Sequence, residues 1–114
     1  MIVDDDRTMT GLLQTLLQLD GFDVVLAGEG STAFAKAAEA RPDAFLVDYH
    51  LREMAGTDFV RQLRQSEQFA RTPVIMTSGL NREEESAEAG ANRFLLKPFE
   101  PDDLVKILKQ VIEN

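Results

Sequence analysis

The chain has 114 residues, of which 44% are hydrophobic and 28% are charged, and these proportions fit one globular domain, residues 1–114, with a single core. It has no cysteine and only one histidine, which excludes a disulfide framework, a zinc–thiolate site and a histidine cluster. A net charge of −8 disfavours nucleic-acid binding, and no apolar run approaches the roughly 20 residues of a membrane span. We therefore expect a soluble, cytoplasmic protein that binds other proteins or cations.

Apolar segments of strand length alternate with segments of helical periodicity along the whole chain. In chain order, the predicted strands are residues 1–3, 22–26, 44–47, 73–77 and 94–96. A helix is expected after each strand, the first capped by Thr8, the second by Ser31 or Thr32, and the last beginning at Pro101. Five strand–helix units predict an α/β fold with a parallel sheet, right-handed crossovers and helices on both faces.

Two of the connections are predicted to be irregular. After Asp48, a loop of residues 49–55 leads to Gly56, which is expected to take a backbone conformation that other residues resist. Residues 81–86 include no apolar side chain. The helix expected between Leu80 and Gly90 should therefore be short and loosely held.

Four predicted strands end in groups that phosphate chemistry uses: Asp4 and Asp5, Asp48, Ser78, and Lys97. Parallel strands place their carboxyl ends along one edge of the sheet, so we expect these side chains to share that edge. Three neighbouring carboxylates repel one another unless a cation joins them, and hard oxygen ligands favour Mg²⁺ or Mn²⁺. Lysine and a hydroxyl would complement phosphoryl oxygens. A carboxylate nucleophile that forms an acyl phosphate is the predicted chemistry.

Taken alone, each of these groups also has a purely structural interpretation. The aspartates at positions 4 to 6 could be a solvated charge run, Asp48 a turn former, Ser78 a cap and Lys97 a surface charge. His50 is predicted to be an exposed loop side chain. The coincidence of four strand ends that each supply a suitable group favours the functional interpretation.

This ordered set of residues resembles the response-regulator receiver domains of two-component signalling systems, of the chemotaxis (CheY-like) type. The resemblance covers essentially the whole chain and rests on the acidic pair, the central aspartate, the hydroxyl, and the run Lys97-Pro98-Phe99. It implies a flavodoxin-like (βα)5 doubly wound sandwich, with five parallel strands in the order 2-1-3-4-5. A cis peptide at Lys97-Pro98 is also implied.

The resemblance implies a role for each residue of the acidic pocket. Asp48 would accept a phosphoryl group from the phosphohistidine of a sensor histidine kinase or a phosphotransfer protein. Mg²⁺ would be bound by Asp5, Asp48 and the backbone carbonyl of His50, while Asp4 would act mainly through water. Lys97 would pair with Asp48 or with its phosphoryl group.

The signalling face departs from the family pattern. By resemblance, Ser78 would bind a phosphoryl oxygen, and Phe94 would take the place of the aromatic switch residue that turns inward as Ser78 moves. Phe94 lacks the hydroxyl of the more familiar tyrosine, Arg52 stands where proline is common, and the segment between Ser78 and Phe94 is about one helical turn (~3.6 residues) short. Either this face is degenerate or mobile, or the segment lacks residues.

Three functions are compatible with these features. The first is a phosphorylatable receiver that catalyses its own phosphorylation and dephosphorylation, with His50 and Leu80 flanking the approach of water and without turnover of an external substrate. The second is a receiver-like scaffold that binds partners without phosphorylation, which the weak fourth helix favours and the complete site opposes. The third is a Mg²⁺-dependent phosphatase, for which Asp48-Tyr49-His50 offers no general acid at the next inward position.

The output partner is expected to be either an effector protein or a covalently attached output domain. If a homodimer forms, its expected contact is the exposed side of the fourth helix, fifth strand and fifth helix.

Overall fold

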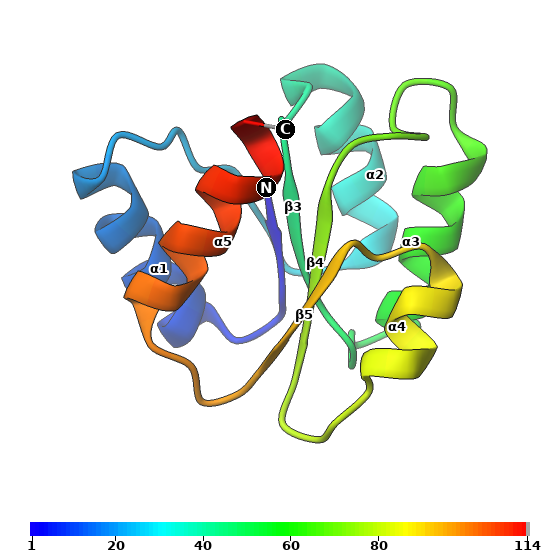
Figure 1. The fold of residues 1–114 in the computed structure, drawn as a ribbon. Coiled ribbons are helices and arrows are strands. Elements are labelled where there is room, and N and C mark those ends of the chain that lie inside the picture. The colour runs from blue at the N-terminus through cyan, green and yellow to red at the C-terminus, as the bar shows by residue number, and fades with distance from the viewer. Residues whose placement is uncertain (114) are drawn as a thin grey trace.

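The computed structural model describes residues 1–113 and contains a parallel five-stranded sheet between two layers of helices (Figure 1). In chain order the elements are β1 (Ile2–Val3), α1 (Arg7–Leu19), β2 (Leu26–Ala27), α2 (Gly30–Ala40), β3 (Phe45–Asp48), α3 (Gly56–Gln65), β4 (Val74–Ser78), α4 (Glu83–Ala89), β5 (Arg93–Leu96) and α5 (Pro101–Glu113). The strand order is β2-β1-β3-β4-β5, and every neighbouring pair is parallel. The predicted α/β class, the (βα)5 architecture and the strand order are confirmed.

Successive residues of a strand point to opposite faces of the sheet, and this alternation divides the core into two clusters. On one face, Phe45 and Val47 pack against α2 and α3, together with Ala89 of α4. On the other face, Leu46 and Ile75 pack against α1 and α5. β3 is buried on both faces, as its continuous apolar sequence predicts. Within residues 1–113, no helix has the length and apolar character that crossing a bilayer requires.

The second strand is shorter than predicted. It was expected over residues 22–26, but only Leu26–Ala27 forms a strand. The parallel register pairs Leu26 with Ile2 and Ala27 with Val3, so the residues before Leu26 extend past the amino end of β1. The hydrogen bond nearest the amino end of this strand pair joins the N–H of Ile2 to the Val25 carbonyl at 2.9 Å. Residues 22–24 lie beyond this position.

Two of the predicted helix caps are wrong. Asp6, not Thr8, caps α1, because its carboxylate accepts the N–H of Met9 at 3.1 Å. Neither residue predicted to cap α2 does so, and the carboxylate of Glu53 accepts the N–H of Ser31 at 3.1 Å instead. This cap comes from the loop after β3, so it ties the start of α2 to that loop.

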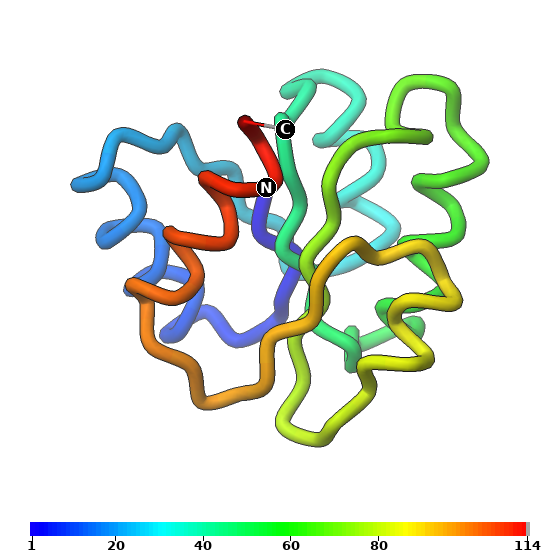
Figure 2. The backbone as a smooth tube through the Cα atoms, viewed as in Figure 1, coloured from blue at the N-terminus to red at the C-terminus, as the bar shows by residue number. Residues whose placement is uncertain are grey.

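All five strands run in one direction, and in Figure 2 their carboxyl ends lie at the lower edge of the molecule, opposite the amino terminus. The loops that follow β1, β3, β4 and β5 therefore share this edge (Figure 2). The predicted short helix between Leu80 and Gly90 is confirmed as α4, and the predicted start of α5 at Pro101 is also confirmed.

Candidate functional site

Three carboxylates meet at the carboxyl edge of the sheet. Asp4 follows β1, and its N–H donates to the carbonyl of Ala27 at 3.0 Å, so its backbone continues the strand pairing. Asp48 is the last residue of β3 and pairs in register with Thr77 of β4. Asp4, Asp5 and Asp48 each place a carboxylate oxygen within 4.8 Å of the other two. Asp4 is only 5% exposed and Asp48 9%, so neither charge is solvated as a surface aspartate would be.

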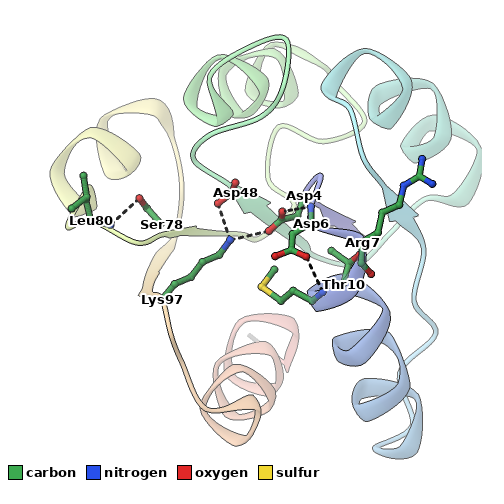
Figure 3. A network of polar contacts seen from close by, with 9 residues as sticks. Asp4, Asp6, Arg7, Thr10, Asp48, Ser78, Leu80 and Lys97 are labelled. Carbon is green, nitrogen blue, oxygen red and sulfur yellow. Dashed lines mark hydrogen bonds and ion pairs between the residues drawn. The ribbon is translucent and has the colours of Figure 1, made fainter.

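Lys97 is the residue directly after β5, and its side chain extends to this cluster (Figure 3). Its Nζ lies 3.0 Å from Oδ2 of Asp4 and 3.1 Å from Oδ1 of Asp48. Burial alone would lower the pKa of Lys97, but the hydrogen bonds to Asp4 and Asp48, and their charges, raise that pKa on balance. The peptide bond between Lys97 and Pro98 is cis, as predicted.

One ammonium group does not balance three carboxylates. Burial, followed by the charge of Asp4, raises the pKa of Asp48, although the hydrogen bond from Lys97 acts in the opposite direction. The folded protein therefore holds an excess of negative charge beside a buried aspartate. A divalent cation would relieve this repulsion, and the all-oxygen donor set suits the hard cation Mg²⁺.

Ser78 lies at the same edge, at the end of β4. Its side chain is buried, and its Oγ accepts the N–H of Leu80 at 3.2 Å (Figure 3). Its backbone carbonyl accepts the N–H of Lys97 at 2.8 Å. The backbones of the hydroxyl-bearing residue and of the lysine are therefore fixed to each other by the sheet.

The other two predicted site residues lie outside the acid cluster. Phe94 is half-buried in β5, pairs in register with Met76, and packs against the core on the α2–α3 face. His50 is an exposed loop side chain, as predicted, and its ring contacts Tyr49 edge-on at a centroid distance of 4.8 Å. The structure thus brings together Asp4, Asp5, Asp48 and Lys97, with Ser78 beside them.

Gly56 closes the loop that follows Asp48, but not for the reason predicted. Within residues 1–113, only Gly21 and Gly90 among the glycines have a positive φ, so Gly56 needs no unusual backbone conformation. A Cβ at Gly56 would instead lie 2.1 Å from the carbonyl oxygen of Asp48. The Gly56 N–H donates to the carbonyl of Tyr49 at 2.7 Å. Glycine therefore allows α3 to start in direct contact with the backbone of Asp48.

A set of polar contacts beside the site was not predicted from the sequence. The hydroxyl of Tyr49 donates to Oε2 of Glu85, and Arg82 lies 5.1 Å above the centre of the Tyr49 ring. Arg82 Nη1 is also 3.3 Å from Oε1 of Glu85. The hydrogen bond raises the pKa of Tyr49 and lowers that of Glu85. The contact joins residues 36 positions apart, and no local pattern in the sequence signals it.

Family profiles and known sequences that are similar to this chain all point to one protein family. The profile of the response regulator receiver domain matches residues 1–109. The chain is 36% identical over 117 residues to the transcriptional regulatory protein CpxR of Klebsiella pneumoniae, a match that covers 100% of the chain and 49% of CpxR. It is 34% identical over 116 residues to the regulatory protein AtoC of Escherichia coli, covering 99% of the chain and 25% of AtoC. The chain thus spans about half of one relative and a quarter of the other.

Solved structures agree with this result. The chemotaxis response regulator CheY4 of Vibrio cholerae has a TM-score of 0.90 and 34% identity, over 96% of the chain and 94% of CheY4. The receiver domain of a sensor histidine kinase from Pseudomonas aeruginosa, which coordinates a magnesium ion in its active-site cleft, has a TM-score of 0.89 and 30% identity, over 99% and 95% of the two chains. The profile match, these similarities and the shared fold show that the chain belongs to the family of response regulator receiver domains of two-component systems.

Proposed function

We propose that Asp48 is the phosphoacceptor of this receiver domain and takes its phosphoryl group from the phosphohistidine of a sensor histidine kinase or a phosphotransfer protein. The observation that carries this proposal is the position of Asp48, buried at the end of β3 between two further aspartates and Lys97. In the transfer, a carboxylate oxygen of Asp48 attacks phosphorus, the P–N bond of the donor breaks, and its electron pair leaves with the histidine nitrogen.

Mg²⁺ is the proposed cofactor, and Mn²⁺ could substitute because it accepts the same oxygen ligands. Asp5, Asp48 and the backbone carbonyl of His50 would hold the ion, with Asp4 acting mainly through water. When bound, the ion supplies positive charge that neutralises the oxygens of the transferring phosphoryl group. The excess of carboxylates over ammonium groups in the cluster supports this assignment.

The two remaining polar groups of the site would act on the phosphorylated state. Lys97 already contacts Asp48, so its ammonium group is positioned to pair with a phosphoryl oxygen on that residue. Ser78 accepts a hydrogen bond from Leu80, which leaves its hydroxyl proton free to be donated to a phosphoryl oxygen. Phe94 is proposed as the aromatic switch residue, and because it has no hydroxyl, its movement would be a change of packing only.

The partners follow from the same proposal. CpxR is named a transcriptional regulatory protein, and this chain covers 49% of its length. We propose that the receiver acts in the cytoplasm on either an attached output domain or a separate effector, and that this acidic domain itself contacts no nucleic acid. If phosphorylation drives dimerisation, the contact would be α4, β5 and α5, where Leu96 is 51% exposed. A native mass that phosphorylation does not change would contradict the dimer.

Intact-protein mass after incubation with acetyl phosphate, with and without Mg²⁺, tests the assignment of Asp48. The parent should gain one phosphoryl group, about 80 Da, only with Mg²⁺, and Asp48→Asn should gain none. Asp43→Asn is a matched control, because Asp43 is an exposed carboxylate two residues before the opposite end of the same strand, and it should behave as the parent. Absence of any gain in a parent that still binds Mg²⁺ would favour a scaffold that binds partners without phosphorylation.

A further inference from the structure

The residue that follows the acceptor has a fixed backbone. The N–H of Tyr49 donates to the carbonyl of Thr77 at 2.8 Å, and its carbonyl accepts the N–H of Gly56 at 2.7 Å. Tyr49 is therefore an extension of the central strand pair, clamped between β4 and the start of α3. Its side chain projects from a rigid base, and any group that it holds is positioned relative to Asp48.

That side chain holds the start of α4. Tyr49 donates its hydroxyl to Glu85, while Arg82 covers the Tyr49 ring and pairs with the same carboxylate. Arg82 is the residue immediately before α4, and Glu85 is the third residue of the helix. We call these three side chains the Tyr49 latch. Each of the three contacts the other two, so loss of one member removes two of the three contacts.

Few other contacts hold the amino end of α4. The helix has seven residues, and only Ser86 and Ala89 are buried. Its N-cap residue, Arg82, makes no side-chain cap hydrogen bond, and apart from the Tyr49 latch the side-chain hydrogen bond at this end is the one in which Oδ1 of Asn81 accepts the N–H of Glu83 at 3.1 Å. Nε of Arg82 and Oγ of Ser86 are buried without a hydrogen-bond partner, so this end of the helix is not fully satisfied. The carboxyl end of α4 is held by a different contact, because Nε of Arg64 donates a hydrogen bond to the carbonyl of Gly90 at 3.0 Å.

We propose that the Tyr49 latch fixes the start of α4 to the acceptor loop, and that release of this latch is the step by which phosphorylation of Asp48 changes the α4 face. The proposal rests on the proposed function, because the trigger is a phosphoryl group on Asp48. It adds a polar coupling through Tyr49, Arg82 and Glu85 to the change of packing at Phe94, which has no hydroxyl to form a hydrogen bond.

A segment of four residues, 79–82, joins Ser78 to the latch. The hydroxyl of Ser78 accepts the N–H of Leu80, and Arg82 follows two residues later. If Oγ of Ser78 moves toward a phosphoryl oxygen to which its hydroxyl donates, the N–H of Leu80 loses its acceptor unless the segment of residues 79–82 shifts with it. Its far end is held by the latch. In the proposed step, the shift of this segment displaces Arg82 and so breaks the contacts of the latch with Tyr49.

Amide hydrogen exchange in residues 83–89 tests the latch directly. The proteins to compare are the parent, Tyr49→Phe, Glu85→Ala, and the double variant, each with and without Mg²⁺ and beryllofluoride as a phosphoryl mimic. Glu84→Ala is the matched control, since Glu84 is an exposed glutamate in the same turn, outside the latch. Tyrosine fluorescence gives a second readout, because Tyr49 is the only tyrosine and the chain has no tryptophan.

The expected pattern is specific. Without beryllofluoride, either latch variant should exchange about fivefold faster in α4 than the parent, a factor that corresponds to about 1 kcal/mol. Beryllofluoride should accelerate exchange in the parent and in Glu84→Ala but add nothing to Tyr49→Phe or Glu85→Ala. The double variant should exchange no faster than either single one, because both substitutions open the same latch.

The failures can be told apart. If the parent gains a phosphoryl group by mass but Tyr49→Phe exchanges and responds to beryllofluoride as the parent does, the latch is overturned while the acceptor assignment stands. Equal effects of Glu84→Ala and Glu85→Ala would also overturn it, since the effect would then be one of helix charge. If the parent gains no phosphoryl group, the proposed function fails and the latch loses its trigger.

Discussion

The acid cluster and the start of α4 lie at the same edge of the sheet but are fixed by different forces. Asp4 and Asp48 belong to the strand pairing through their backbones, and Lys97 joins them by two ion pairs. The amino end of α4 is held by side chains on the surface, through Tyr49 and Glu85. Backbone pairing between buried strands opens only with much of the fold, whereas a surface contact opens locally at low cost.

This difference assigns the phosphorylation chemistry to the acid cluster and the signalling to α4. A nucleophile and its charge partners need fixed positions, which the sheet provides. A face that reports a covalent change needs two accessible positions, which a seven-residue helix with few buried residues can provide. Substitutions in the two regions should therefore have different consequences, and the following four are ordered by the size of the expected effect.

Gly56→Ala should cause the largest loss of stability. The added Cβ would lie 2.1 Å from the carbonyl oxygen of Asp48, and its nearest neighbours are all backbone atoms of Asp48 and Tyr49, which cannot move aside as a flexible side chain could. We expect a loss of about 3 kcal/mol in the free energy of unfolding, at the upper end of overpacking effects. Urea denaturation measures it. Gly79→Ala is the control, since its added Cβ would have no neighbour within 4 Å, and equal losses for the two variants would contradict the close approach.

Lys97→Met should have the next largest effect and should depend on Mg²⁺. Removing the ammonium group leaves the carboxylates of Asp4 and Asp48 buried without their cation. Because Lys97 is 24% exposed, we expect a loss of about 2 kcal/mol without Mg²⁺, below the value for a fully buried pair. Added Mg²⁺ should restore part of it. Lys106→Met, at an exposed lysine of α5, should change little, and a loss unaffected by Mg²⁺ would argue against a cation site.

Arg64→Met should loosen the carboxyl end of α4 without touching the acid cluster. The guanidinium of Arg64 donates to carbonyls of Gly90, Phe69 and Thr72 at 2.7 to 3.0 Å and to the side chain of Asn92 at 2.9 Å. We expect a loss of about 1.5 kcal/mol and faster amide exchange in α4, with phosphorylation by acetyl phosphate retained.

Arg61 serves as the control for this variant. It lies on the same helix and has one exposed ion pair, with Asp58, so Arg61→Met should cost only about 0.3 kcal/mol. Loss of phosphorylation in Arg64→Met would contradict the separation of the two regions.

Asp48→Asn should stabilise the protein near neutral pH. The pKa of Asp48 is raised in the folded protein, chiefly by burial, so the folded state favours the protonated form and the anion costs stability. This cost is absent below the ordinary aspartate pKa of about 4 and grows as the pH rises through the raised value. The unfolding midpoints of the parent and Asp48→Asn, without Mg²⁺, should therefore converge toward pH 4. A variant less stable than the parent near neutral pH would contradict the sign.

The parts of the structure that the sequence predicts are those encoded by local chemistry. The continuous apolar run before Asp48 marks a buried strand, and the polar residues at four strand ends must meet because parallel strands share an edge. The short α4 was likewise predicted from composition, whereas the cis peptide before Pro98 was implied by the family resemblance.

The parts that were missed depend on pairs of residues far apart in the chain. The length of β2 is set by its register with β1, which no property of residues 22–25 reveals. The cap of α2 comes from Glu53, 22 positions beyond the residue it binds. Gly56 is required by a contact with Asp48, and Tyr49 meets Glu85 only after both elements are placed. Local propensity cannot anticipate such contacts, because tertiary packing creates them.

The most direct test of the account is the location of the phosphoryl group in the chain. After phosphorylation by acetyl phosphate in Mg²⁺, borohydride reduction converts an aspartyl phosphate to homoserine, and peptide mass spectrometry identifies the residue. We predict homoserine at position 48 in the parent, in Tyr49→Phe and in Arg64→Met alike, because the acid cluster is fixed independently of α4. Homoserine at Asp4 or Asp5, or a phosphoryl group that survives on a serine or tyrosine, would contradict it.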